Sequence, residues 1–120
     1  MTRQLLATFA LLLWIDSASA VRVIEQIERP VELTLDELNF SAGGSVVSFS
    51  ECATCGSSTH RVTDSTVYKV NGRTLPLADF LSVIGEIRQR PGADGKTFAV
   101  VFLDLESGRV TRLEIREPAR

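Results

Sequence analysis

The sequence predicts a mostly β fold of the α+β class: a small, partly open barrel of about six antiparallel strands with one amphipathic helix. Three observations lead to this prediction. Several short stretches alternate apolar with polar residues, which is the pattern of half-buried strands. Turn signals such as Asn71-Gly72 separate these stretches at short intervals, as in antiparallel hairpins. One stretch, residues 77–87, carries apolar residues at helical spacing instead.

The strands predicted before the helix follow from local composition. Residues 31–35 alternate strictly, and residues 46–50 form a second strand after a glycine-containing turn at 41–45. Residues 60–62 resume an extended chain, and we expect a turn at 63–65, where Asp64 can bond its own backbone. Residues 66–70 are rich in β-branched and aromatic side chains, so they predict a strand whose partner returns at 73–75.

One helix is predicted between these strands and the last hairpin. Its apolar stripe consists of Leu77, Phe80, Leu81, Ile84 and Ile87. Pro76 suits the first helical position, and Pro91-Gly92 ends the helix. Gly85 lowers helix stability by about 1 kcal/mol relative to alanine. We therefore expect a neighbouring segment to approach the helix closely there.

The chain ends in a predicted hairpin. Residues 97–106 are almost wholly apolar, so we expect a central strand covered on both faces. Ser107-Gly108 turns the chain, and residues 110–117 return as an alternating strand. Its apolar positions include Leu113 and Ile115, and its other face is charged and therefore expected to be solvated.

Two of these stretches carry a resemblance. Residues 66–80 (TVYKVNGRTLPLADF) and residues 108–115 (GRVTRLEI) resemble exported bacterial OB-like β-barrel domains of uncharacterised function. The likeness covers about half of the mature chain. It implies a small OB-like barrel and carries no catalytic residues across. A sheet with the helix packed on one face is the alternative architecture.

The N-terminus has the build of a secretory signal peptide. Arg3 is followed by an apolar run at 5–15 and by small residues at 18–20. The run is shorter than the roughly 20 residues that span a bilayer, so we expect cleavage and no stable membrane anchor afterwards. The predicted organisation is therefore a signal peptide at 1–20, a lead-in segment at 21–30 and a single β-rich domain at 31–117. The mature chain is expected to be exported, to the periplasm or beyond the cell.

Composition narrows the partners. The formal net charge is −2, without the basic excess that nucleic-acid binding usually needs. We expect no nucleic-acid partner. The partner is expected to be a protein or a small molecule of unknown identity.

Cys52 and Cys55 are the only cysteines, and they stand three residues apart. A turn brings such residues within disulfide distance, so an oxidising compartment favours a local structural disulfide. Two alternatives remain open. A redox-active pair would need a helix after the first cysteine, which lowers the thiol pKa, whereas the residues that follow are poor helix formers. A zinc or copper site could use Cys52, Cys55 and His60, with Glu51 or Asp64 as a further ligand for zinc.

The sequence offers no other catalytic constellation. It has no G-x-S-x-G motif, and His60 is its only imidazole. Ser57 and Ser58 are so close to His60 in sequence that the usual Ser–His geometry would need a special loop. We therefore predict a non-enzymatic binding or interaction module, with no catalytic residues and no cofactor. The alternative function is a periplasmic thiol-based redox or metal-binding protein.

Overall fold

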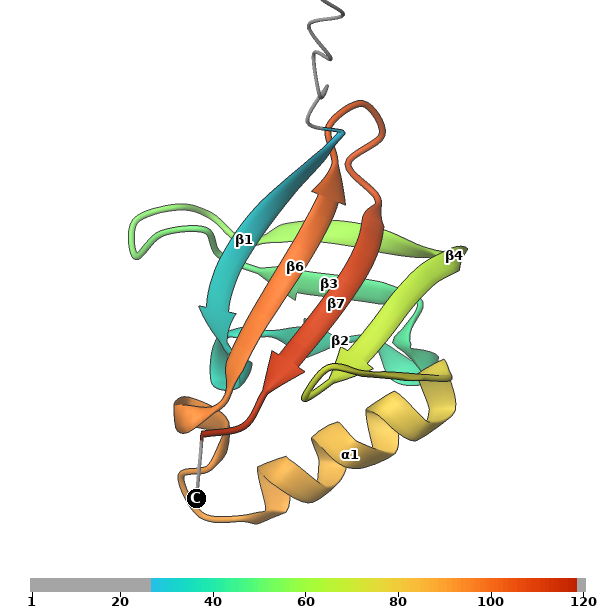
Figure 1. Ribbon diagram of the computed structural model, residues 1–120. Coiled ribbons are helices and arrows are strands. Elements are labelled where there is room, and N and C mark those ends of the chain that lie inside the picture. Colours follow the sequence, from blue (N-terminus) through green and yellow to red (C-terminus); the bar gives the residue numbers. More distant parts are fainter. Residues whose placement is uncertain (1–26, 119–120) are drawn as a thin grey trace, which may run out of the picture.

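The computed structural model describes residues 27–118 and shows a strongly curled sheet with one helix across its lower end (Figure 1). The predicted signal peptide and most of the lead-in segment lie outside the described residues. The strands are β1 (Glu28–Thr34), β2 (Asn39–Phe40), β3 (Val46–Phe49), β4 (Ser58–Val70), β5 (Arg73–Leu75), β6 (Phe98–Asp104) and β7 (Val110–Arg116). The helices are α1 (Leu77–Gln89) and the single-turn segments η1 (Leu35–Glu37), η2 (Ala42–Gly44) and η3 (Asp94–Lys96).

The strand order corrects one part of the predicted architecture. Within the described residues the sheet has seven strands in the order β1-β6-β7-β4-β3-β2, with β5 attached to β4. All neighbours are antiparallel except β4 and β7, which pair in parallel. The expectation of antiparallel strands throughout was therefore wrong for this pair. A parallel pair needs a long crossover connection, and here α1 and β6 lie within that connection.

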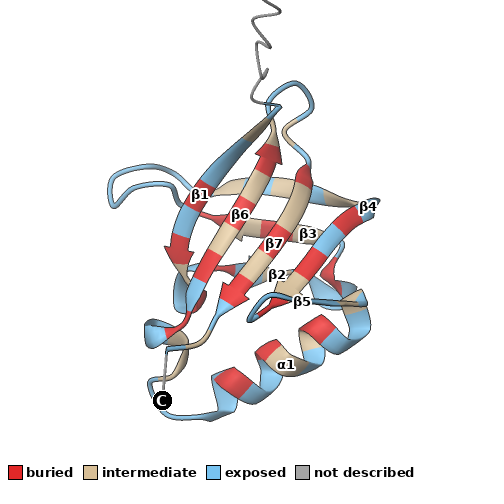
Figure 2. Cartoon of the chain, in the orientation of Figure 1, coloured by how far each residue is buried: buried red, intermediate tan, exposed pale blue. Residues whose placement is uncertain are grey.

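The core fills the concave side of the curled sheet, and α1 closes its lower end (Figure 2). Phe80, Ile84 and Ile87 are the buried residues of the helix, as the apolar stripe predicts. The Phe80 ring lies 5.0 Å from the Tyr68 ring of β4 and 6.2 Å from the Phe40 ring of β2. Helix and sheet therefore share one core. The helix begins one residue later than expected, with Pro76 as its N-cap.

The predicted turn at 63–65 is instead part of β4. The strand continues through these residues, and its register with β7 shifts between Val62 and Val67. The Thr66 hydroxyl accepts the Thr63 amide (2.8 Å) and donates to the Val110 carbonyl (2.6 Å). Residues 63–65 therefore form an irregularity inside a long strand and not a separate turn. The Thr66 side chain makes up for hydrogen bonds between β4 and β7 that are lost where the register shifts.

Two expectations about close packing were wrong. β6 is covered on one face only: Ala99, Val101 and Leu103 are buried, whereas Phe98 is 60% exposed. A methyl group at Gly85 would meet no atom of residues 27–118 within 4 Å, so none of the described segments approaches the helix there. The close approach to α1 occurs at Gly44, where an added Cβ would lie 3.0 Å from Leu81 Cδ1. Among residues 27–118, no helix has the length and apolar character to cross a membrane.

Candidate functional site at the seam of the sheet

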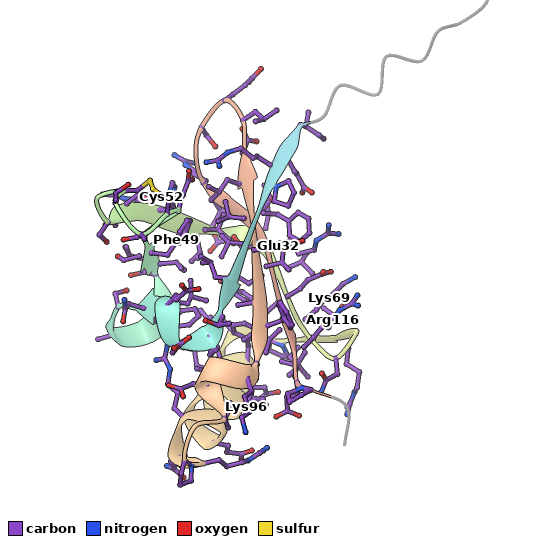
Figure 3. All side chains as sticks on the ribbon, turned by 90° about the vertical axis from the view of Figure 1, so that its left-hand side faces the viewer. Glu32, Phe49, Cys52, Lys69, Lys96 and Arg116 are labelled. Atoms are coloured by element: carbon purple, nitrogen blue, oxygen red, sulfur yellow. A yellow bond between two sulfur atoms is a disulfide. The ribbon has the colours of Figure 1, made fainter. Side chains whose placement is uncertain are left out.

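The curled sheet does not close on itself along its whole length, and a cleft of about 480 Å³ lies where it stays open. β1 forms one wall. The end of β3 and the loop 50–57 that follows it form the opposite wall, and η1 with β2 forms the lower end (Figure 3). Leu33 and Phe49 are the buried residues at its base. We call this site the seam cleft; its polar lining residues are Glu32, Glu37, Asn39, Ser50, Glu51 and Ser57.

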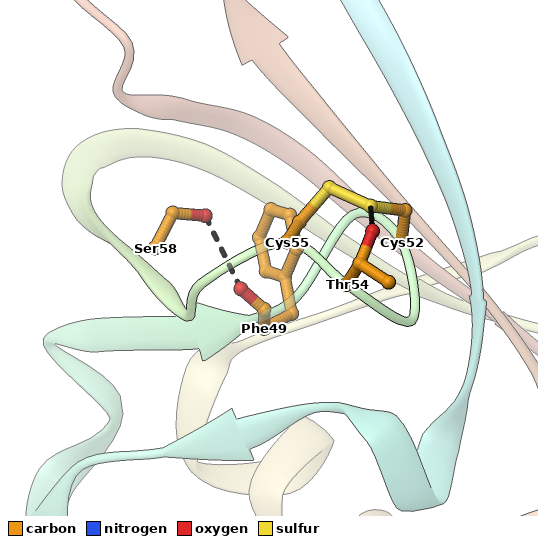
Figure 4. The surroundings of a disulfide bond; sticks show 5 residues. All are labelled: Phe49, Cys52, Thr54, Cys55 and Ser58. Atoms are coloured by element: carbon orange, nitrogen blue, oxygen red, sulfur yellow. Dashed lines mark hydrogen bonds between the residues drawn. A yellow bond between two sulfur atoms is a disulfide. The ribbon is translucent and has the colours of Figure 1, made fainter.

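The disulfide predicted between Cys52 and Cys55 is present and shapes the loop beside the cleft (Figure 4). The two Cα atoms are 5.0 Å apart, and the Cys55 amide donates to the Cys52 carbonyl at 3.1 Å. The crosslink therefore locks a single turn. At the base of the loop the Ser58 hydroxyl donates to the Phe49 carbonyl (3.2 Å). The disulfide thus fixes the shape of the connection between β3 and β4, which is otherwise exposed.

An ion pair joins the two walls across the cleft. Arg29 of β1 donates to a carboxylate oxygen of Glu51 at 2.6 Å. The hydrogen bond from Arg29 lowers the pKa of the Glu51 carboxyl, and the positive charge adds to this effect. The same bond raises the pKa of Arg29. Both side chains are more than a third exposed, so the contact orients the loop toward β1 without adding much to stability.

Three carboxylates line the seam cleft, and Arg29 pairs with only one of them. Glu37 accepts the backbone amide of Thr34 and is held by it at 2.9 Å. Glu32 forms no hydrogen bond or ion pair with any residue in the range 27–118, and it projects from the wall formed by β1 (Figure 3). The cleft therefore carries an excess of negative charge.

His60 does not join the cysteines in a site. Its Nδ1 lies 2.8 Å from the Gly108 carbonyl, so Nδ1 carries a proton, and Nε2 lies 3.1 Å from the Ser58 hydroxyl oxygen. The ring stacks on Phe49 at 5.1 Å. In the described part of the chain, no group of three or more His, Cys, Asp or Glu side chains is placed to hold a metal ion. Both ring nitrogens are engaged in protein contacts, and this does not favour the metal alternative.

The Ser58–His60 contact is nevertheless closer than the sequence suggested. Residues i and i+2 of a strand point to the same face, so β4 brings the hydroxyl to the imidazole without a special loop. The same hydroxyl also lies within bonding distance of the Phe49 carbonyl, and neither Ser58 nor His60 lines the seam cleft. We interpret the pair as structural: it connects β4 to the end of β3 and to the turn before β7.

The redox alternative finds no structural support in the loop. A reactive cysteine pair requires a helix N-terminus or a cationic neighbour that stabilises the thiolate. Residues 50–57 contain no helical turn, and the nearby cation Arg29 is paired with Glu51.

Comparison with protein-family models, with curated proteins and with solved structures finds no match for this chain. The function is therefore inferred from the site itself.

Of the residues around the cleft, sequence reasoning identified the cysteines and considered Glu51 as a metal ligand. It missed Arg29, Glu32 and Glu37. No local pattern links these residues, because they converge through the pairing of β1 with β6 and of β2 with β3. The alternation in β1 was the only available signal, since it directs Glu32 away from the core.

Proposed function

We propose that this chain is an exported, non-enzymatic binding module and that the seam cleft is its ligand site. The observation that carries the proposal is the cleft, because a volume of about 480 Å³ lies within the range of ligand pockets, roughly 300–1,000 Å³. The cleft combines an apolar base with several polar groups at its rim. The disulfide beside it is consistent with folding in an oxidising compartment.

The OB-like type of barrel is part of the same proposal. β1 pairs with β6 and β2 pairs with β3, so the two are halves of one strand that bends at η1. If they are counted once and β5 is treated as an appendage, five strands form a partly open barrel, with the helix after the third. This description is consistent with a small OB-like barrel.

Thiol titration tests this proposal against the thiol-based alternative. A structural disulfide should show no free thiol in the purified protein and two after treatment with reductant. Reduction should lower the free energy of unfolding by about 2 kcal/mol, because the closed loop is so short that little chain entropy is at stake. Urea denaturation of the oxidised and reduced protein measures this difference.

The same samples are then titrated with Zn(II) and Cu(I). The binding-module proposal expects neither metal to stabilise the reduced protein. Stoichiometric metal uptake that is abolished by His60→Ala would support the metal alternative instead. Catalytic oxidation of a dithiol substrate, with glutathione disulfide as the terminal oxidant, would support the redox alternative.

A further inference from the structure

We propose that the seam cleft binds an extended peptide segment with a basic side chain, which adds as a short strand to the free edge of β1. The inference rests on the proposed function and specifies its ligand. Three features of the cleft support this inference. They are the free backbone groups along the edge of β1, the absence of a free amide at the positions on either side of them, and the charge of the lining residues.

The hydrogen bonds at the two ends of the β1–β6 ladder show which backbone groups are free. The Leu35 amide donates to the Thr97 carbonyl, and the Leu105 amide donates to the Ile27 carbonyl. The register between these ends has no shift. In an antiparallel ladder, alternate residues bond to the partner strand, so the odd-numbered residues of β1 face β6. The even-numbered residues therefore direct their amide and carbonyl groups toward the open edge.

Only a short part of this edge can accept a strand. Pro30 has no amide hydrogen, and the Thr34 amide is occupied by the Glu37 carboxylate at 2.9 Å. Between them, Glu32 presents both its amide and its carbonyl, and Pro30 presents its carbonyl. The edge is thus protected against long strand pairing, as edge strands commonly are, but keeps one complete donor–acceptor position next to the cleft.

These groups define the chemistry of the ligand. The two free carbonyls need N–H donors, and the Glu32 amide needs an acceptor. A peptide backbone in extended form supplies both at strand spacing. A polyamine has donors alone and would leave the Glu32 amide without a partner. The edge therefore fits a peptide better than a simple organic cation.

The lining selects the side chain. Glu32, Glu37 and Glu51 place three carboxylates in the lining of the cleft, and Arg29, at its margin, pairs with one of them. A lysine or arginine side chain entering between β1 and the disulfide loop would reduce this excess of negative charge. A guanidinium would also donate to several of the oxygen atoms there, because its donors form a planar fork. Acidic segments are expected to be repelled.

The test is an NMR titration of the uniformly ¹⁵N-labelled, oxidised protein. The probe is a capped tripeptide with arginine between two valines, since valine favours the extended conformation. We expect shifts at residues around the seam cleft and slower exchange of the Glu32 amide with deuterium. The matched tripeptide with glutamate in place of arginine should not bind, and spermidine should leave Glu32 exchange unchanged.

Two charge variants make the titration specific. Glu32→Gln should weaken the binding of the arginine tripeptide about tenfold, because it removes the carboxylate nearest the added strand. Glu86→Gln makes the same change on the exposed surface of α1 and should leave binding unchanged. Heteronuclear spectra of both variants verify that the fold is retained.

Several results would overturn the inference. One is equal binding of the arginine and glutamate tripeptides, and another is equal effects of the two variants. Protection of the Glu32 amide by neither probe would exclude strand addition, and spermidine shifting the same residues would then identify a cation site. None of these outcomes depends on free thiols or on metal uptake. The NMR titration can therefore exclude a basic peptide as the ligand while the thiol titration still supports the proposed function.

Discussion

Two glycines illustrate how differently one residue type can act in this fold. Gly44 has a φ of +74° and lies buried against α1, where an added Cβ would meet Leu81 and Leu77 side chains. Gly85 lies within the helix, is exposed, and has no neighbour for a Cβ to touch. The first glycine is required by its surroundings, whereas the second only weakens its helix.

We therefore expect Gly85→Ala to raise the free energy of unfolding by about 1 kcal/mol, because alanine loses less backbone entropy in a helix. Urea denaturation followed by far-ultraviolet circular dichroism measures the change. Gly44→Ala serves as the contrast and should destabilise the protein, because its backbone is left-handed and its Cβ site is crowded. A neutral or destabilising Gly85→Ala would show that this position has a contact or role that its open surroundings do not reveal.

At the residue scale, the sequence predicted the features that depend on local spacing. The pairing of Cys52 with Cys55 follows from a four-residue turn, and the burial of Phe80 and Ile84 follows from helical periodicity. It did not predict that Glu32 and Glu51 line one cleft, because nothing in their local surroundings records that β1 and the loop after β3 face each other.

The β6–β7 hairpin depends on one carboxylate at its turn. The Asp104 side chain accepts the backbone amides of Ser107 (2.9 Å) and Glu106 (2.8 Å). These bonds, with that from Ser107 as the larger influence, lower the pKa of the Asp104 carboxyl below its usual range. The charged form is therefore the one that holds the turn closed.

Asp104→Asn should accordingly destabilise the hairpin in a pH-dependent way. Because the folded pKa is lowered, the stabilisation is complete above the ordinary value of about 3.9 and disappears as the pH falls through the folded value. The difference in unfolding temperature between the two proteins should therefore be constant near neutral pH and disappear at strongly acidic pH. Thermal unfolding of both proteins at a series of pH values measures it. A difference that persists at strongly acidic pH would show that the carboxylate acts through shape instead of charge.

At the element scale, hairpins were easier to predict than long-range pairings. Asn71 adopts a φ of +50° and Gly72 a φ of +83°, as the Asn-Gly signal requires of a type I′ turn. The parallel pairing of β4 with β7 had no comparable signal, since it joins residues at least 45 positions apart in the sequence. The apolar outer positions of β6 misled the prediction because Phe102 is half-buried beneath Arg112, whose guanidinium lies 3.9 Å from the ring centre.

At the scale of the whole molecule, the mostly β character was predicted correctly, and so was the one α-helix found within residues 27–118, because both follow from periodicity summed over many residues. How far the curled sheet closes on itself could not be predicted from the sequence, since this depends on the bend at η1 and on contacts between distant strands. One of these contacts is the hydrogen bond from Arg88 of α1 to the Leu38 carbonyl, which ties the helix to the segment between η1 and β2. The seam cleft is a product of that incomplete closure.

Export of the protein would be visible in its mass. A protein that crosses a membrane through a signal peptide should lose residues 1–20 and form the Cys52–Cys55 disulfide after translocation. Intact-mass spectrometry of the protein from its native host should therefore give a chain that begins near Val21 and lacks the two thiol hydrogens. Reduction before the measurement should restore them, which separates a disulfide from other modifications. A mass that retains residues 1–20 together with two free thiols would contradict export. The Cys52–Cys55 disulfide would then not form in the cell, and the loop that makes one wall of the seam cleft would lose its crosslink.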